Sequence, residues 1–435
     1  SDMQTEFSIA QLADPNIQAA NEILRKCVHC GFCTATCPTF VLKGDELDSP
    51  RGRIYLMKEA FQKDEPATEK LATHLDRCLS CLSCMTTCPA SVDYMHLVDY
   101  GRTFVHETHT RAWHDRILRW VLTIVLPYPK MFRLSLLGAA MGKPFKGLLP
   151  PRLKAMLELA PGNVAPPSQV DVPQVFKTKT EPKMRVALLS GCAQQVLRPS
   201  INEATVRVLT RLGCEVVIAK DQGCCGALVH HMGREHDGHE AAKRNIRAWE
   251  ASEAEYGTID AVVINASGCG TTVKDYGWML RLDPEWADRA KAISDKTKDI
   301  SEVLLTLGLS GVVEQPNLTV AYHSACSMQH GQQLKTEPLS LLKDAGFTVL
   351  QPSESHICCG SAGTYNIMQP EWAGELRERK VGNIRKLKAD VVATGNIGCL
   401  TQIAGGMGGE DDPVVVHTVE LIDWVTGGPK PEELA

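Results

Sequence analysis

The stretch Cys27-Val-His-Cys30-Gly-Phe-Cys33-Thr-Ala-Thr-Cys37-Pro38 holds four cysteines in eleven residues, and its spacing returns in Cys78-Leu-Ser-Cys81-Leu-Ser-Cys84-Met-Thr-Thr-Cys88-Pro89. At this spacing three cysteines hold one [4Fe–4S] cluster, while the fourth ligates the partner cluster of a two-cluster ferredoxin. Structural zinc is the alternative, although zinc sites prefer two separated cysteine pairs. We therefore predict two [4Fe–4S] clusters. Their predicted ligands are Cys27, Cys30, Cys33 and Cys88 for the first, and Cys78, Cys81, Cys84 and Cys37 for the second.

The second half of the chain repeats itself. A shift of 134 residues brings Cys192, Cys224, Cys225 and Gly226 onto Cys326, Cys358, Cys359 and Gly360. Further on, Asp260–Cys269 matches Asp390–Cys399 at an offset of 130. In each copy, apolar runs that end near a cysteine alternate with helical stretches, a pattern that predicts βαβ units around a parallel sheet. Open sheets of this kind bind their ligands at the carboxyl ends of the strands.

Each copy therefore brings four cysteines to one predicted site, and we expect pseudo-twofold symmetry between the two sites. Adjacent cysteines such as Cys224 and Cys225 point in different directions, which favours a multi-iron centre over a single ion. Zinc, a site of free thiols and a strained disulfide are the alternatives. Gly226 and Gly360 would let the backbone approach the cofactor. The predicted cofactor-binding residues are Cys192, Cys224, Cys225 and Cys269 in one copy, and Cys326, Cys358, Cys359 and Cys399 in the other.

The composition is that of an ordinary globular protein with many cysteines. Of 435 residues, 44% are hydrophobic and 22% are charged, which excludes wholesale disorder and a polytopic membrane protein. A formal charge of -5 provides no basic field for nucleic acid. The 17 cysteines are odd in number and closely grouped, and the sequence has no charged-then-apolar leader. We therefore expect a reduced, cytoplasmic compartment and no secreted disulfide framework.

These patterns predict an α+β multidomain chain of five parts. We expect a helical 2[4Fe–4S] ferredoxin-like domain (3–110), a basic amphipathic helical segment (111–160), a proline-rich linker (161–183), and two repeated α/β cysteine-rich domains (184–310 and 311–435). We call the last two CCG domains after their Cys-Cys-Gly motif. From Arg111 to Ala155 the chain carries nine Arg or Lys residues and one acid, interleaved with aromatic residues. Such a segment binds an anionic lipid surface or a partner subunit, and the sequence favours neither.

Other residues near the motifs form less specific patterns. His231, Glu235 and His239 share one helical face through i, i+4 spacing, which suits a solvated helix or a metal site. His323 and His356 lie just before cysteines of the second copy. There they would tune a cluster through hydrogen bonds to sulfur, or pack in the core. Cys214 has no cysteine counterpart in the second copy, so we predict a buried small hydrophobe.

Taken together, the motifs resemble those of the iron–sulfur subunits of bacterial glycolate oxidase, within a wider group of ferredoxin-plus-cysteine-rich-domain proteins. The likeness covers nearly the full length and is carried by Cys27–Pro38, Gly44–Ile54, Ala266–Gly270 and Cys358–Tyr365. One departure concerns the C-x-x-C that ends the cysteine-rich motif of heterodisulfide reductase subunits. Here Cys269 is followed by Gly-Thr-Thr and Cys399 by Leu-Thr-Gln, so the type of cluster at these sites stays open.

The resemblance implies an electron-transfer subunit of a glycolate dehydrogenase-type oxidoreductase. Flavin-containing partner subunits would oxidise glycolate to glyoxylate. This chain would pass the electrons to a quinone or another acceptor, with peripheral contact on the inner face of the cell membrane and no catalytic residue of its own for glycolate. The alternatives are the iron–sulfur subunit of a related D-lactate or glycerol-3-phosphate dehydrogenase, and a heterodisulfide-reductase-like enzyme that acts at a CCG site.

Overall fold

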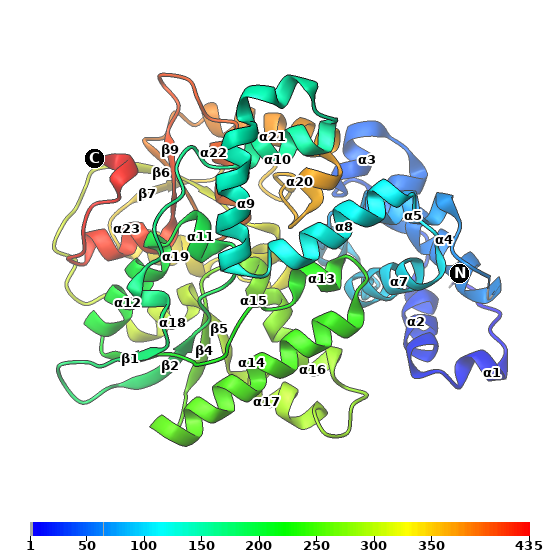
Figure 1. Ribbon diagram of the computed structural model, residues 1–435, viewed down its shortest axis with the longest axis horizontal. Helices are drawn as coiled ribbons and strands as arrows, with labels where there is room; N and C mark the ends of the chain where they lie inside the picture. Colours follow the sequence, from blue (N-terminus) through cyan, green and yellow to red (C-terminus); the bar gives the residue numbers. More distant parts are fainter. Residues whose placement is uncertain (1–2, 64) are drawn as a thin grey trace.

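The computed structural model describes residues 3–63 and 65–435 (Figure 1). Its N-terminal part is helical, as predicted, and packs around a core that includes Leu24, Met57, Leu75 and Leu97. The proline that follows the first cysteine motif has a structural role, because Pro38 supplies the first residue of a helix directly after Cys37. The helices of this part are α1 (Ile9–Leu12), α2 (Pro15–Lys26), α3 (Pro38–Lys43), α4 (Pro50–Lys63), α5 (Glu69–Asp76), α6 (Ser83–Thr87) and α7 (Tyr94–Thr108).

The first CCG half contains a five-stranded sheet with the order β1-β3-β2-β4-β5. Its strands are β1 (Gln174–Phe176), β2 (Met184–Leu188), β3 (Cys214–Ile218), β4 (Ala261–Ile264) and β5 (Thr297–Asp299). All pairs are parallel except β1 with β3, so the proline-rich linker contributes an antiparallel edge strand that its composition did not predict. The helices are α11 (Gln194–Leu197), α12 (Ser200–Arg211), α13 (Ala227–His231), α14 (Glu235–Tyr256), α15 (Ser267–Lys274), α16 (Tyr276–Met279), α17 (Ala287–Lys296) and α18 (Ile300–Leu307).

The second CCG half repeats this sheet without the edge strand. The order β7-β6-β8-β9 matches β3-β2-β4-β5, and every pair is parallel. The strands are β6 (Thr319–His323), β7 (Thr348–Leu350), β8 (Val391–Thr394) and β9 (Val414–His417). The helices are α19 (Glu337–Asp344), α20 (Tyr365–Met368), α21 (Pro370–Arg385), α22 (Ile397–Ala404) and α23 (Thr418–Val425). The predicted α+β class with two repeated CCG domains is therefore confirmed.

The two halves share one hydrophobic core and are joined by buried polar contacts. Val186 and Val263 of the first sheet belong to the same buried cluster as Val320 and Val392 of the second. At their junction the His417 Nε2 lies 2.7 Å from the carbonyl oxygen of Asn265. Because the halves share a core, they form one packed unit and bring their cysteine sites close together.

The basic segment folds into three helices that cover the cysteine sites, and we call them the lid helices. They are α8 (Trp113–Val125), α9 (Pro129–Gly142) and α10 (Pro151–Leu159), with α9 at the centre front of Figure 1. Many of their cations face inward: Arg119 binds Asp115 and Asp76 at 2.8 and 3.1 Å, and Arg152 binds Asp115 at 2.6 Å. In the described part of the chain, the helices are too short or too polar to span a bilayer.

Candidate metal centres

Two loops of the ferredoxin-like domain curl around their cysteines in the same way. In the first loop His29 and Gly31 have φ angles of 54° and 83°, and at the matching positions of the second loop Ser80 and Leu82 have 50° and 60°. Left-handed residues at alternate positions wind the backbone tightly, so the cysteines beside them face one centre. This conformation costs a side-chain-bearing residue about 1–2 kcal/mol. The repeated strain is typical of a ligand-binding loop.

Each predicted set of ferredoxin cysteines lines its own pocket. One pocket is lined by Cys27, Cys30, Cys33 and Cys88, together with Cys84. The other is lined by Cys37, Cys78, Cys81 and Cys84. The structure thus brings together the four cysteines predicted for each cluster, including the exchange of Cys37 and Cys88 between the two motifs. Cys84 lies in the wall between the pockets. We call these the first and second ferredoxin sites.

The two ferredoxin sites differ in exposure. At the first site Cys30 is exposed and the neighbouring Phe32 ring is 63% exposed. Arg51, whose Nε lies 2.5 Å from Glu46 Oε1, flanks this site at the surface. The second site is enclosed by the protein, and Cys37, Cys78 and Cys84 are buried there. The first site is therefore accessible to another protein, whereas the second communicates with the interior.

A buried arginine provides positive charge beside the second ferredoxin site. Arg53 is 1% exposed; its Nε donates to the His74 carbonyl at 2.7 Å and its Nη1 to Cys37 Sγ at 3.8 Å. Burial opposes its charge, but the thiols of Cys78 and Cys37 outweigh burial and raise the pKa of Arg53. In the same way burial would raise the pKa of Cys78, yet Arg53 and Arg102 lower it. This arrangement stabilises thiolate ligands. Sequence patterns gave no sign of Arg53.

The eight CCG cysteines lie where the strands of the two sheets end. Cys192 and Cys326 follow β2 and β6, the Cys-Cys pairs follow β3 and β7, and Cys269 and Cys399 lie in α15 and α22, directly after β4 and β8. This is the carboxyl edge predicted for a ligand site in such sheets. We call the two groups the first and second CCG sites.

Backbone N–H groups point at the sulfurs of both CCG sites. The Gly226 N–H donates to Cys224 Sγ at 3.5 Å, and the Gly360 N–H donates to Cys358 Sγ at 3.4 Å. Both glycines are left-handed, with φ of 93° and 90°. A Cβ on Gly360 would come within 2.7 Å of the Ala373 carbonyl oxygen in α21. Glycine is thus needed to pack the loop against a helix, a different reason from the predicted approach to a cofactor.

The sulfurs within each CCG site are close enough to shift one another's pKa. Hydrogen bonding between Cys192 and Cys224 holds the pKa of Cys224 well below its usual range and raises the pKa of Cys192, and Cys358 and Cys326 form a matching pair. Hydrogen bonding with Cys359 lowers the pKa of Cys399 to about 5. Thiolate is the form that binds metal. Four converging sulfurs per site, with N–H donors aimed at them, therefore fit an iron–sulfur or other thiolate-bound centre.

One cavity of about 580 Å³ connects the two CCG sites. All eight CCG cysteines line it, and so do Cys78 and Cys81 of the second ferredoxin site. The lid helices close it from outside with apolar side chains that include Leu122, Leu126, Phe132 and Leu136. The structure therefore places three cysteine sites around a single, mainly apolar space.

Comparison with known proteins assigns the chain to a family. A 4Fe-4S dicluster domain matches residues 23–92, and a cysteine-rich domain matches 186–274 and 320–404. The chain is 41% identical to the glycolate oxidase iron-sulfur subunit of Escherichia coli K12, over 97% of this chain and 98% of that protein. It belongs to the family of glycolate oxidase iron-sulfur subunits. The resemblance noted in the sequence is confirmed, and the chain is an iron–sulfur, electron-transfer subunit of an oxidoreductase with two [4Fe–4S] clusters.

Three further proteins place the family in a wider context. The probable glycolate oxidase iron-sulfur subunit of Bacillus subtilis is 33% identical over 97% of this chain and 98% of that protein. Lactate utilization protein A of the same species matches only 55% of this chain, at 31% identity. A hypothetical protein from Helicobacter pylori shares the fold, with a TM-score of 0.53 and 10% identity over 97% of this chain and 74% of the other.

In this member of the family, the second ferredoxin site packs against the second CCG site. Leu79 and Cys81 belong to one hydrophobic cluster with Cys326, Cys358 and Tyr365. The Tyr365 hydroxyl donates to the Arg77 carbonyl at 3.1 Å, and Thr86 Oγ1 lies 2.7 Å from His330 Nδ1. These contacts hold two sets of sulfur ligands on opposite sides of one packed interface.

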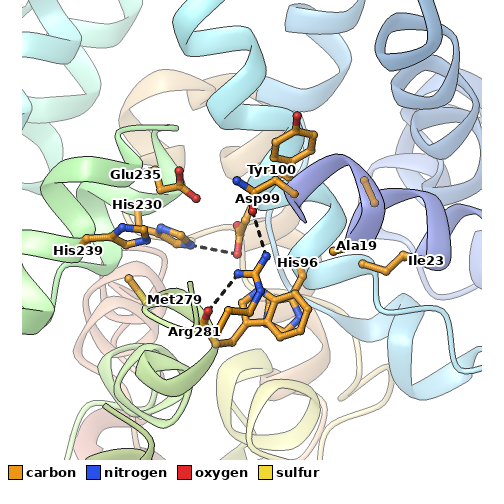
Figure 2. Close-up of a pocket in the computed structure, with 13 residues that line it drawn as sticks. Ala19, Ile23, His96, Asp99, Tyr100, His230, Glu235, His239, Met279 and Arg281 are labelled. Atoms are coloured by element: carbon orange, nitrogen blue, oxygen red, sulfur yellow. Dashed lines mark hydrogen bonds and ion pairs between the residues drawn. The ribbon is translucent and has the colours of Figure 1, made fainter. Parts of the chain in front are cut away.

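The first CCG half contacts the ferredoxin-like domain through charged groups (Figure 2). His230 Nε2 lies 3.2 Å from Asp99 Oδ2, and His96 lies between Asp93 and Asp275, at 2.5 and 2.8 Å. Burial opposes protonation of His96, but the two carboxylates outweigh burial and raise its pKa to about 9. His96, Asp99 and His230 line a small pocket away from the cysteines.

The alternative of a metal site on His231, Glu235 and His239 is wrong for the described residues. His231 ends α13 whereas Glu235 and His239 lie in α14, so the three residues do not share the predicted single helical face. His231 approaches Asp99 instead, at 3.7 Å, and the three side chains do not come together at ligand distances. The prediction for Cys214 is confirmed, because its side chain is fully buried in the core beneath the first sheet.

Proposed function

We propose that the chain carries electrons from a flavin-containing partner subunit, which oxidises glycolate to glyoxylate, to a membrane quinone. Bound iron–sulfur clusters supply the one-electron carriers. We propose that the chain divides into the five parts predicted from the sequence. These are the ferredoxin-like domain (3–110), the basic helical segment (111–160), the linker (161–183) and the two CCG domains (184–310 and 311–435). The proposed metal ligands are Cys27, Cys30, Cys33 and Cys88 for the first ferredoxin site, and Cys37, Cys78, Cys81 and Cys84 for the second. The proposed cofactor ligands of the CCG sites are Cys192, Cys224, Cys225 and Cys269 for the first, and Cys326, Cys358, Cys359 and Cys399 for the second.

The observation that carries this proposal is the packed interface between the second ferredoxin site and the second CCG site. There, Cys81 packs against the buried cluster that contains Cys358, so the two sites meet across packed side chains. The first ferredoxin site supports the opposite role. Its Cys30 and Phe32 are exposed, which suits contact with a donor subunit. The direction proposed is therefore from the exposed site, through the buried one, to the second CCG site.

The cavity between the CCG sites supports quinone as the acceptor. Its volume of about 580 Å³ is in the range of ligand pockets, and its walls are mainly apolar. The lid side chains Leu122, Phe132 and Leu136 would contact an isoprenoid tail, while the cysteine sites would lie beside the reducible ring. The same cavity has to accommodate any centre bound by the CCG cysteines.

The outer face of the lid helices supports membrane contact. Trp113, Trp120, Met141 and Leu148 are all more than half exposed there. Tryptophan favours the membrane interface, and lysine and arginine are drawn to anionic headgroups. The exposed cations of this segment are Arg116, Lys130, Lys146 and Lys154. Asp115 faces inward and binds Arg119 and Arg152, so it does not offset that charge. Glu158 is exposed and lies 3.8 Å from Lys154, so it offsets one of the four cations. We therefore propose an anionic lipid surface on the inner face of the membrane as the contact.

A reconstituted complex tests the electron donor. The chain is combined anaerobically with its flavin-containing partner subunits, and the visible absorbance of the iron–sulfur clusters is followed after addition of glycolate, D-lactate or glycerol 3-phosphate. We expect bleaching with glycolate only. Clusters that stay oxidised with glycolate, or that respond better to another donor, would contradict the proposal.

Vesicles test the acceptor and the membrane contact. We expect the chain to sediment with phosphatidylglycerol vesicles and not with phosphatidylcholine vesicles. Trp120→Ser combined with Lys130→Glu should reduce this binding several-fold, while Tyr256→Ser, an exposed aromatic away from the lid, should leave it unchanged. Equal vesicle binding by both variants would count against the membrane contact.

The quinone site is tested by a bulky Leu136→Trp substitution in the cavity wall, which should slow the reduction of decylubiquinone. A rate that is unaffected by this substitution would count against the cavity as the quinone site.

A further inference from the structure

The two CCG sites differ in one buried side chain next to their cysteines. At the 134-residue offset that aligns the cysteines, His323 of the second half takes the place of Leu189 in the first. Both side chains are buried, at 1% and 2% exposure. Leucine is suited to a buried apolar position, whereas a histidine at the same position needs hydrogen-bond partners or ligands for its two ring nitrogens.

His323 points at the sulfurs of the second CCG site. It is the last residue of β6, at the carboxyl edge of the sheet, three residues before Cys326. One of its ring nitrogens and the Sγ atoms of Cys359 and Cys399 all lie within 4.8 Å of one another. In the described chain, this is the one group at ligand distances that combines histidine with cysteine.

Neither ring nitrogen of His323 is paired with a nitrogen or oxygen atom. The polar group that its ring meets is the Cys399 thiol, whose pKa is lowered by hydrogen bonding with Cys359 and with His323. Other buried histidines of the chain are partnered differently. His417 Nδ1 accepts from the Val419 N–H at 3.0 Å while its Nε2 lies 2.7 Å from the Asn265 carbonyl oxygen, and both nitrogens of His330 are likewise paired. A buried polar group without a partner costs about 1–3 kcal/mol. Such a cost, next to converging sulfurs, is typical of a ligand residue and not of a packing residue.

A buried cation near His323 partly offsets the negative charge of the four thiolates, and the imidazole would add a ligand without adding charge. An imidazole ligand adds no charge, and it suits both iron and zinc. Lys380, buried in α21, donates to the Glu354 carbonyl at 3.0 Å and lies near the same cysteines. The corresponding helix of the first half also provides a cation, because Arg244 and its neighbour Asn245 donate to the Cys224 carbonyl at 3.1 and 3.0 Å. The two sites therefore differ in His323 and not in the presence of a nearby cation. Nitrogen ligation and reduced negative charge both raise the reduction potential of an iron–sulfur centre.

We propose that His323 is a nitrogen ligand of the metal centre at the second CCG site, alongside its four cysteines. The two duplicated sites then hold unlike centres: one with sulfur ligands only, the other with mixed ligands and a higher reduction potential. The second site is therefore the preferred destination of electrons. This inference rests on the proposed occupancy of the second CCG site, and it is independent of which substrate reduces the partner subunit.

Nitrogen coupling in pulsed EPR tests the proposal. The full chain is purified anaerobically from cells grown with 15N-histidine, and the paramagnetic signals are examined across a redox titration. We expect one signal beyond those of the two ferredoxin clusters, with a directly bound nitrogen. His323→Leu, which copies the first half, should abolish that coupling, while His356→Asn, two residues before Cys358, should retain it.

A second variant distinguishes loss of the nitrogen ligand from loss of folding. His323→Cys keeps a ligand at the position, so we expect the metal content of the wild type, no nitrogen coupling and a lower midpoint potential for that signal. A second-site signal without bound nitrogen in the wild type would overturn the proposal while leaving the proposed function intact. A chain with only the roughly eight irons of two [4Fe–4S] clusters and no other metal would overturn both the histidine ligand and the occupancy on which it rests.

Discussion

The two CCG halves have the same strand order, the same four cysteines and the same glycine beside the Cys-Cys pair, but they differ in a buried side chain and in their contacts with the ferredoxin-like domain. The first half has Leu189 beside its sulfurs and contacts the ferredoxin-like domain through the ion pairs of His96 and His230. The second half has His323 beside its sulfurs and packs its site directly onto the second ferredoxin site. The duplication thus preserved the backbone and the cysteine positions, while neighbouring residues give the two sites different surroundings.

The largest expected effect separates the two sites by function. Replacement of both Cys358 and Cys359 by serine should reduce glycolate-dependent quinone reduction in the reconstituted complex by at least about 100-fold, because loss of ligands exceeds the effect of loss of their outer-shell partners. The same change at Cys224 and Cys225 should cost only a few-fold, since that site is off the direct route.

EPR of the reduced ferredoxin clusters serves as the control in this experiment. Both double variants should show the wild-type ferredoxin signals. If the two variants lose activity equally, or if the first-site variant loses more, the distinction between the halves is wrong.

The next-largest effect concerns the buried positive charge of Arg53 beside the second ferredoxin site. Arg53→Met should destabilise the chain by about 3 kcal/mol, because it leaves Asp48 and the thiolates of the second ferredoxin site short of a buried cation. Arg51→Met at the exposed first site should cost about 0.2–1 kcal/mol, the range of a surface ion pair. Urea unfolding of the two anaerobic variants measures both values, and equal losses would refute the proposed contrast.

The pH dependence should also distinguish the two halves. Carboxylates raise the pKa of His96 to about 9, from an ordinary value of 6.5. Its stabilising contribution is therefore complete below about pH 6.5 and is lost as the pH rises through about 9. The difference in unfolding free energy between the wild type and His96→Asn should shrink over this interval. A difference that stays constant from pH 6.5 to 9 would show that His96 does not titrate in its contact with the first half.

The last prediction concerns the hydrogen bond between Thr86 of the ferredoxin-like domain and His330 of the second CCG half. Thr86→Val removes the partner of His330 Nδ1 and should cost about 1 kcal/mol. Burial lowers the pKa of His330 to about 4, so this ring is neutral at pH 6.5 and above. The cost of the substitution should therefore be the same at pH 6.5 and pH 9, in contrast to His96. A cost that changes strongly over this interval would contradict a neutral contact.

The features that the sequence predicted are those whose parts are close along the chain. The ferredoxin cysteines lie within eleven-residue motifs, so spacing alone groups them, and the structure places Cys37 and Cys88 beside the predicted partners. The duplication was visible for a similar reason, since the offset of 134 residues is constant across four positions. It predicted two equivalent parallel sheets with cysteines at their carboxyl edges.

The features that the sequence did not reveal depend on residues brought together by folding. Arg53 contacts the Cys37 sulfur only because α4 packs beside the second ferredoxin site. The inward orientation of Arg119 depends on Asp76, which lies 43 positions away in the chain. The segment predicted as a linker provides β1, because the edge of β3 offers hydrogen bonds that composition does not show. The role of His323 was open between tuning and packing until its neighbours were known.

Rapid freeze-quench EPR of the reconstituted complex after mixing with glycolate tests the central claim most directly, namely that electrons leave through the second CCG site. The account predicts that the ferredoxin signals change first, that a further signal with bound nitrogen follows, and that the later signal is missing when Cys358 and Cys359 are serines. Quinone reduction at the wild-type rate in that variant, with no signal from the second site at any time, would contradict it.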